Sequence, residues 1–168
     1  MNQAVQPGQP EEIVLPPDAD EDAPIQLSKN FWLREFHHPR ADIPEELVPA
    51  LEGFVQKNVQ KIRDFFNTPM SILSGYRPPK YNQRPGQAKY SYHQYGHVTR
   101  KGEPVQEEAS VKNRPGKFAV DIQVRGVQPI FVYQAILGLM RLGVIEKGAV
   151  IAYKNFVHYD NRGVIVPL

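Results

Sequence analysis

Residues 91–96 read Ser-Tyr-His-Gln-Tyr-Gly, and residues 116–122 read Gly-Lys-Phe-Ala-Val-Asp-Ile. The stretch that begins with the first segment and ends with the second is the one around which the chain is organised. The first segment carries His93, and the second carries Asp121 in a strand-like apolar run. A later run, Phe-Val-His-Tyr-Asp, carries His158. Two imidazoles and one carboxylate make a three-ligand site that leaves one position open for water, as catalytic zinc requires. These three side chains are therefore candidate metal ligands.

The same residues also have an ordinary structural interpretation. A histidine in an apolar run is often a core residue with satisfied hydrogen bonds, and a chain with five histidines and 18 acidic residues offers many His/Asp/His triples. A carboxylate in a buried strand, however, needs a compensating partner, and a metal ion is one such partner. From these residues alone, both interpretations remain open.

Four segments carry a resemblance to a known family. They include Ser-Gly-Tyr-Arg-x-Pro-x-Tyr-Asn, followed by Ser-x-His-x-x-Gly, which together form a specific combination. In chain order the segments are residues 28–36, 72–82, 91–121 and 153–162. They resemble the zinc D-Ala-D-Ala carboxypeptidases, the M15 metallopeptidases, and most closely their small carboxypeptidase-like branch. The resemblance covers roughly residues 28–168.

This resemblance implies a zinc D-Ala-D-Ala peptidase-like fold, a Zn²⁺ cofactor, and His93, Asp121 and His158 as the metal ligands. The family pattern Ser-x-His-x-x-Gly-x-Ala-x-Asp is compact, whereas 27 residues separate His93 from Asp121 here. The assignment of Asp121 as the second ligand therefore depends on the sequence Gly-Lys-Phe-Ala-Val-Asp around it and not on its spacing from His93. We expect the three ligands to converge on one tetrahedral ion at about 2.0–2.2 Å.

A zinc hydrolase also needs a base that takes a proton from water. The glutamate base of the family's dipeptidase branch has no counterpart here, because Tyr153 occupies that position. Asp160 is the predicted base, since strand alternation places it on the same face as His158. The alternative is that Asp160 orients a ligand histidine. Arg77 resembles the family arginine that faces the site, where a guanidinium suits a peptide carboxylate or an oxyanion, although a surface arginine in a proline turn is the alternative.

Composition limits the kind of protein. The 168 residues suit a single domain with a substantial core, and 41% are hydrophobic and 23% charged. The absence of cysteine excludes disulfides and thiolate metal sites. No signal-peptide pattern is visible, and no apolar run is long enough to span a bilayer, so no membrane partner is expected. The compartment stays open, with virion association or export by another route among the options.

Residues 1–27 are predicted to be an extended acidic tail. They contain five prolines and six acidic residues but no lysine or arginine, and such a segment buries too little apolar surface to offset its ordering entropy. The apolar run Ile13-Val14-Leu15 is a candidate anchor on a partner protein. A disordered leader and a docking segment both remain open. Without those six acids, the net charge of +2 becomes +8 for residues 28–168.

Apolar periodicity predicts an α+β domain with a small, largely antiparallel sheet flanked by helices. The first helix is predicted from an N-cap at Asp42 to Phe66, with Asn67-Thr68-Pro69 ending it. A second helix is predicted from Ile130 to Leu142. The predicted strands are residues 70–74, 118–124, 149–153, 156–159 and 164–166.

Residues 97–116 form an insertion relative to the compact family pattern. Loops of this length are usually functional or disordered, so a lid over the site, a partner-binding loop and a solvated loop are all open. His97 is predicted to be a loop residue near the site. The basic residues of the insertion suit an anionic cell-wall polymer, and no nucleic-acid-binding signature is present, so nucleic acid is not expected as a partner.

Two functions from different classes are consistent with these patterns. The leading hypothesis is a zinc-dependent peptidase that cleaves a D-amino-acid-containing bond in the stem peptides of peptidoglycan. The alternative is a structural or binding component of a larger assembly, such as a phage particle, that retains the peptidase fold and docks through residues 1–27. The three retained ligands favour the enzyme, whereas the interrupted motif and the missing glutamate favour the assembly component.

Overall fold

The computed structural model describes residues 24–78, 81, 91–95 and 116–167. Most of the predicted tail and nearly all of the predicted insertion, including His97, lie outside the described residues, so those predictions remain untested. No helix in the described part of the chain is long and apolar enough to cross a membrane.

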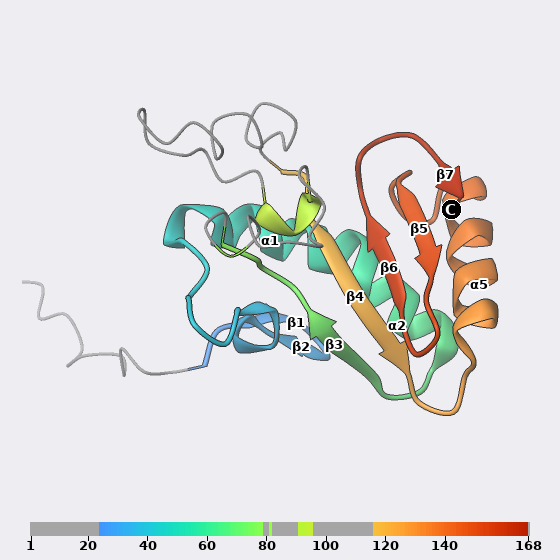
Figure 1. Ribbon diagram of the computed structural model, residues 1–168, viewed down its shortest axis with the longest axis horizontal. Helices are drawn as coiled ribbons and strands as arrows, with labels where there is room; N and C mark the ends of the chain where they lie inside the picture. Colours follow the sequence, from blue (N-terminus) through green and yellow to red (C-terminus); the bar gives the residue numbers. More distant parts are fainter. Residues whose placement is uncertain (1–23, 79–80, 82–90, 96–115, 168) are drawn as a thin grey trace, which may run out of the picture.

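A five-stranded sheet forms the centre of the domain, in the order β3-β4-β6-β5-β7 (Figure 1). Neighbouring strands run antiparallel, except that β5 and β7 are parallel. This arrangement, together with the helices, confirms the predicted α+β class. Four strands lie within one residue of their predicted bounds at each end, whereas β7 begins two residues later than predicted. The strands are β3 (Met70–Ser74), β4 (Ala119–Val124), β5 (Ala149–Ala152), β6 (Val157–Asp160) and β7 (Val166–Pro167).

The long first helix is a run of four consecutive helical segments. They are η2 (Glu45–Leu47, 3₁₀), α1 (Val48–Phe54), η3 (Val55–Val59, π-helical) and α2 (Gln60–Phe66). The prediction that Asp42 caps this run was wrong: Pro44 is the N-cap residue, and the exposed Asp42 lies 2.9 Å from Nδ1 of His37 instead. The predicted end is confirmed, because Asn67 adopts the left-handed conformation with φ 47°.

The core lies between this helical run and the sheet. Along β4 and β6, alternate residues point towards the helices and are fully buried. The Phe54 ring of α1 lies 5.4 Å from the ring of Phe118 and 6.1 Å from that of Tyr159. Burying each such side chain contributes about 1.5–3 kcal/mol. The last helix, α5 (Pro129–Arg141), packs mainly against β5 and was predicted to within one residue at each end.

An N-terminal hairpin, which was not predicted, completes the described domain. It comprises β1 (Gln26–Ser28) and β2 (Phe31–Trp32), and the 3₁₀ helix η1 (Leu33–Phe36) follows directly. Leu27 is buried, so the folded domain begins before residue 28, inside the segment assigned to the tail.

Candidate metal centre

Sheet register brings two of the predicted ligands together. In the antiparallel pair of β4 and β6, Asp121 lies directly opposite His158. Directly opposed residues share a face of the sheet, and here it is the face turned away from the helical run. Asp160 lies two residues beyond His158 and opposite Ala119, so it points to the same face, as strand alternation predicted.

The third ligand comes from a short turn. His93 lies in the 3₁₀ helix η4 (Tyr92–Gln94), where the hydroxyl of Ser91 accepts a hydrogen bond from the His93 amide. The His93 carbonyl accepts a hydrogen bond of 2.7 Å from the amide of Arg77. Its ring Nδ1 lies 2.7 Å from the carbonyl oxygen of Gly75. A carbonyl only accepts, so Nδ1 carries the proton and Nε2 is left with its lone pair.

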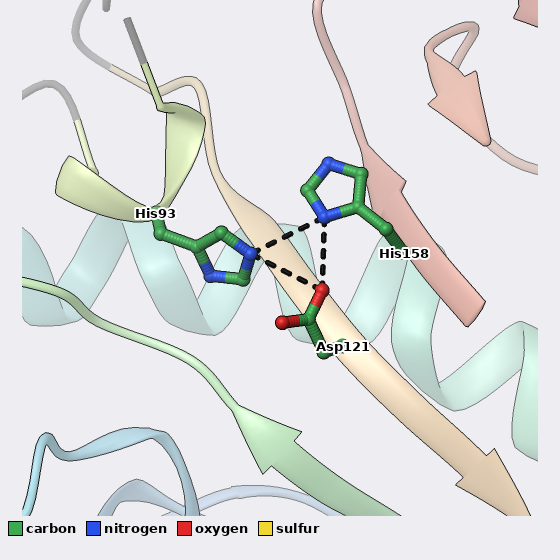
Figure 2. Close-up of side chains that lie close together, drawn as sticks. All are labelled: His93, Asp121 and His158. Atoms are coloured by element: carbon green, nitrogen blue, oxygen red, sulfur yellow. Dashed lines mark hydrogen bonds and ion pairs between the residues drawn. The ribbon is translucent and has the colours of Figure 1, made fainter. Parts of the chain in front are cut away.

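Three donor atoms from these segments converge on one point (Figure 2). Nε2 of His93 lies 3.2 Å from Oδ1 of Asp121 and 3.2 Å from Nδ1 of His158. Nδ1 of His158 lies 2.9 Å from the same carboxylate oxygen. The structure thus brings together all three residues that the sequence singled out as ligands, and they form a group able to hold a metal ion.

The donor set fits zinc. Two imidazole nitrogens and one carboxylate oxygen are typical zinc ligands, and they leave a position open, as in catalytic sites. Tetrahedral bonds of about 2.0–2.1 Å place neighbouring ligand atoms roughly 3.3 Å apart, close to the separations found here. The lone pair on Nε2 of His93 faces the Asp121 carboxylate, and a cation between the two would remove their repulsion.

The protonation states of the cluster follow from burial and pairing. Burial would raise the pKa of Asp121, but the contacts of its carboxylate with His158 and His93 outweigh burial and hold the pKa well below its usual range. Burial lowers the pKa of His93, which favours the neutral ring that a metal requires. Burial would also lower the pKa of His158, but hydrogen bonds to Asp121 and Asp160 outweigh it and raise that pKa. A metal ion therefore competes with a proton at His158.

Asp160 is a fully buried carboxylate that accepts hydrogen bonds from several partners. Its Oδ2 lies 3.4 Å from Nε2 of His158 and 2.6 Å from Nη2 of Arg162. The amide of Ala149 donates a hydrogen bond of 3.1 Å to Oδ1. Burial would raise the pKa of Asp160, but these hydrogen bonds lower it well below its usual range. Of the two roles that the sequence left open, these contacts favour orientation of His158 over proton abstraction.

Arg77 lies beside the cluster, on the side of the second Asp121 oxygen. Its Nη2 atom is 3.7 Å from Oδ2 of Asp121 and donates a hydrogen bond of 3.3 Å to Ser74. The two oxygens of Asp121 therefore have different surroundings, with the histidines at Oδ1 and the guanidinium at Oδ2. Arg77 thus adds positive charge next to the candidate metal position.

Two supporting residues were not singled out from the sequence. A Cβ atom on Gly75 would lie 2.6 Å from the Phe36 carbonyl oxygen and 2.7 Å from the Tyr95 hydroxyl, so only glycine fits where the carbonyl holds His93. Arg162 supports Asp160 through its guanidinium. Both lie inside segments that carry the family resemblance, and that resemblance was the available signal. Neither is a typical metal-ligand or general-base residue, so their spacing in the sequence does not indicate a role.

Comparison with known proteins gives one match. The family model described as Peptidase M15 matches residues 30–160, which is most of the chain. No curated protein and no solved structure matches the chain. The matched span includes all three residues of the metal-binding group, together with the turn and strands that position them. The chain therefore belongs to the peptidase M15 family, a family of metallopeptidases.

Proposed function

We propose that this protein is a zinc-dependent peptidase that cleaves a D-amino-acid-containing bond in the stem peptides of peptidoglycan. One observation carries the proposal: three donor atoms lie within 3.2 Å of one another, and the outer nitrogen of each histidine faces an acceptor. The Gly75 carbonyl accepts a hydrogen bond from Nδ1 of His93, and Asp160 accepts one from Nε2 of His158. The other nitrogen of each ring, which faces the cluster, is therefore available for a metal. Purely structural histidines have no need of such an arrangement.

The metal would be held by His93, Asp121 and His158. A zinc ion bound there supplies a Lewis acid and lowers the pKa of water, which is the chemistry that peptide hydrolysis at neutral pH needs. The protein's own contribution is to fix the three donors before the metal arrives. Two of them lie on adjacent strands, and the third lies on a turn that is hydrogen-bonded to Gly75 and Arg77, just after β3, so little reorganisation is required.

Arg77 is the candidate substrate-binding residue. Its Nη2 atom lies 3.7 Å from Oδ2 of Asp121, the carboxylate oxygen that does not contact the histidines. A peptide with a free C-terminal carboxylate would find a fixed positive charge there, and an oxyanion that develops at the cleaved bond would be stabilised by the same group. This placement suits a carboxypeptidase acting on short anionic peptides.

Asp160 is assigned an orienting role and not the role of the base. Its two oxygens accept hydrogen bonds from the side chain of Arg162, the amide of Ala149 and the ring of His158, which leaves it poorly placed to take a proton from water. Among the described residues, Asp121 and Asp160 are the carboxylates that pair with the two histidines.

The test combines metal analysis with a substrate pair. Purified protein should contain about one zinc ion per chain and should hydrolyse a peptide ending in D-Ala-D-Ala but not its L-Ala-L-Ala isomer. A chelator should abolish the activity, and added zinc should restore it. The variant Arg77→Gln should keep its zinc but lose about 10²–10³-fold in kcat/KM, because one donor to the developing charge is removed.

The outcomes separate the two classes of function. Absence of zinc from the wild-type protein after loading would refute the metallopeptidase proposal. Stoichiometric zinc without hydrolysis of any D-amino-acid peptide would refute the substrate assignment and favour a non-catalytic component that retains the fold.

A further inference from the structure

We propose that Arg162 is a positioning residue that joins the two histidine-bearing segments of the metal centre. These segments are η4, which carries His93, and β6, which carries His158. Among the described residues, no hydrogen bond or ion pair joins Arg162 to either histidine, and its effect passes through Asp160 on one side and Tyr92 on the other. This inference rests on the proposed metal centre, and it assigns a role to a residue that lies outside the ligand set.

The contact with Asp160 is an ion pair with several hydrogen bonds. Nε of Arg162 lies 2.9 Å from Oδ1 of Asp160, and Nη2 lies 2.6 Å from Oδ2. The backbone amide of Arg162 also donates to Oδ1, at 3.2 Å. Asp160 has no exposed surface, so its charge depends on these partners. The side-on geometry fixes the plane of the carboxylate, and with it the oxygen that faces His158.

The contact with Tyr92 reaches the other segment. The guanidinium carbon of Arg162 lies 4.8 Å from the centre of the Tyr92 ring, within the range of a cation–π interaction. Tyr92 directly precedes His93 in η4, so the ring that Arg162 contacts and the ligand share one turn of 3₁₀ helix. One guanidinium therefore contacts both of the segments whose relative position brings the two histidines together.

This geometry predicts what is lost when the guanidinium is removed. Without Arg162, the buried carboxylate of Asp160 loses its only contact with a lysine or arginine among the described residues. The carboxylate is then free to rotate or to take up a proton, and the Nε2 partner of His158 becomes ill defined. The η4 turn simultaneously loses a packing contact on Tyr92. Both changes loosen the preorganised donors and should weaken metal binding.

The experiment measures zinc affinity by competition with a chromophoric chelator, using full-length protein whose fold is checked by circular dichroism. Arg162→Met should weaken zinc binding by about 10–100-fold, as expected for a partner of a metal ligand. Arg162→Lys should fall between Arg162→Met and the wild type, because it keeps the charge but not the side-on geometry. The matched control Arg141→Met removes an exposed arginine at the end of α5 and should leave the zinc affinity unchanged.

The Tyr92 variants test the second contact. Tyr92→Leu should weaken zinc binding by a few-fold, about what one exposed cation–π contact provides. Tyr92→Phe keeps the aromatic ring and should therefore keep the wild-type zinc affinity. In an Arg162→Met background, Tyr92→Leu should have no further effect. This loss of additivity is the signature of a shared contact and is not expected from two independent structural defects.

The outcomes are distinguishable. If the wild type binds no zinc, the proposed function fails and the role of Arg162 fails with it. If the wild type binds zinc and folded Arg162→Met binds it equally well, only the inference about Arg162 is overturned. A lower melting temperature with unchanged zinc affinity would likewise overturn it. Should Arg162→Met fail to fold, Arg162→Lys and Tyr92→Leu decide, and wild-type affinity in both would reject the proposal.

Discussion

The candidate metal centre takes its predicted ligands from two regions that are built differently. Asp121 and His158 lie on β4 and β6, which are interior strands with a hydrogen-bonded neighbour on each side. His93 lies on η4, a single turn of 3₁₀ helix held by its contacts with Ser91, Arg77 and Gly75. The sheet fixes two ligands through backbone register, whereas the turn depends on a few individual contacts. Substitutions near the turn should therefore affect metal binding out of proportion to their effect on folding.

The largest effect is expected at the sheet ligand that contacts both histidines. Asp121→Ala removes the carboxylate whose Oδ1 lies 3.2 Å from His93 and 2.9 Å from His158. We expect loss of zinc binding beyond the roughly 10–100-fold typical of residues that only orient a ligand. Hydrolysis should be lost with it. Zinc content after dialysis measures the outcome, and full zinc occupancy in the variant would show that Asp121 is not a ligand.

Asp160→Asn tests the sheet region's supporting residue. If Asp160 orients His158, the variant should bind zinc about 10–100-fold more weakly, and saturating zinc should recover most of its activity. If Asp160 were instead the general base, zinc affinity would stay unchanged and the rate would fall by about 10²–10⁴-fold at saturating metal. Measuring zinc affinity and kcat on the same variant separates the two roles.

Gly75→Ala tests the turn region. The added methyl group would approach the Phe36 carbonyl oxygen to 2.6 Å, so the backbone that presents the Gly75 carbonyl to His93 has to shift. We expect about 1–3 kcal/mol lower stability, and zinc binding weakened about tenfold, at the lower end of the effect of losing a ligand's partner.

Gly138→Ala in α5 is the matched control for this substitution. Apart from the neighbouring residues and the nearby backbone of α5 itself, no atom lies within 4 Å of its added methyl group, and alanine should stabilise the helix by about 0.5–1 kcal/mol without changing the zinc affinity. Equal zinc affinity in Gly75→Ala and the wild type would show that the turn is not the sensitive region.

The elements predicted well from the sequence are those with a strong local signal. The helix ending at Asn67, the α5 helix and strand β4 all show clear apolar periodicity, and each was predicted nearly to its ends. The hairpin of β1 and β2 was missed because its strands have three and two residues, too few to show alternation. Asp42 was wrongly predicted to be an N-cap, because an aspartate shortly before an early proline is a common helix start and nothing local indicates its pairing with His37.

The candidate site shows the same division. The ligand residue types and the shared face of His158 and Asp160 followed from motif and alternation. Pairing of Asp121 with His158 depends on the register between strands that are far apart in sequence, which no local pattern specifies. The partners of Asp160 could not be predicted either. The contact with Arg162 depends on the backbone conformation just after β6, which brings the Arg162 side chain back to Asp160.

The smallest expected effect is the pH dependence of stability that Asp160 gives the metal-free protein. Hydrogen bonds hold the pKa of Asp160 below its usual value of 3.8, so its stabilising contribution is present above that pH and is lost as the pH falls below it. The stability difference between wild type and Asp160→Asn should therefore shrink below about pH 4, by at most about 1.4 kcal/mol per pH unit.

The same difference should also decline on the alkaline side, because Asp160 helps to raise the pKa of His158. A raised histidine pKa stabilises the fold below the ordinary value of 6.5, and that contribution is lost as the pH rises through the folded-state pKa. The difference should therefore be largest between about pH 5 and 6. Asp121 titrates in both proteins and largely cancels. Urea unfolding of chelator-treated protein from pH 3 to 9 measures the profile. A difference independent of pH would mean that Asp160 stabilises the strand by packing alone, and that its charge does not reach His158.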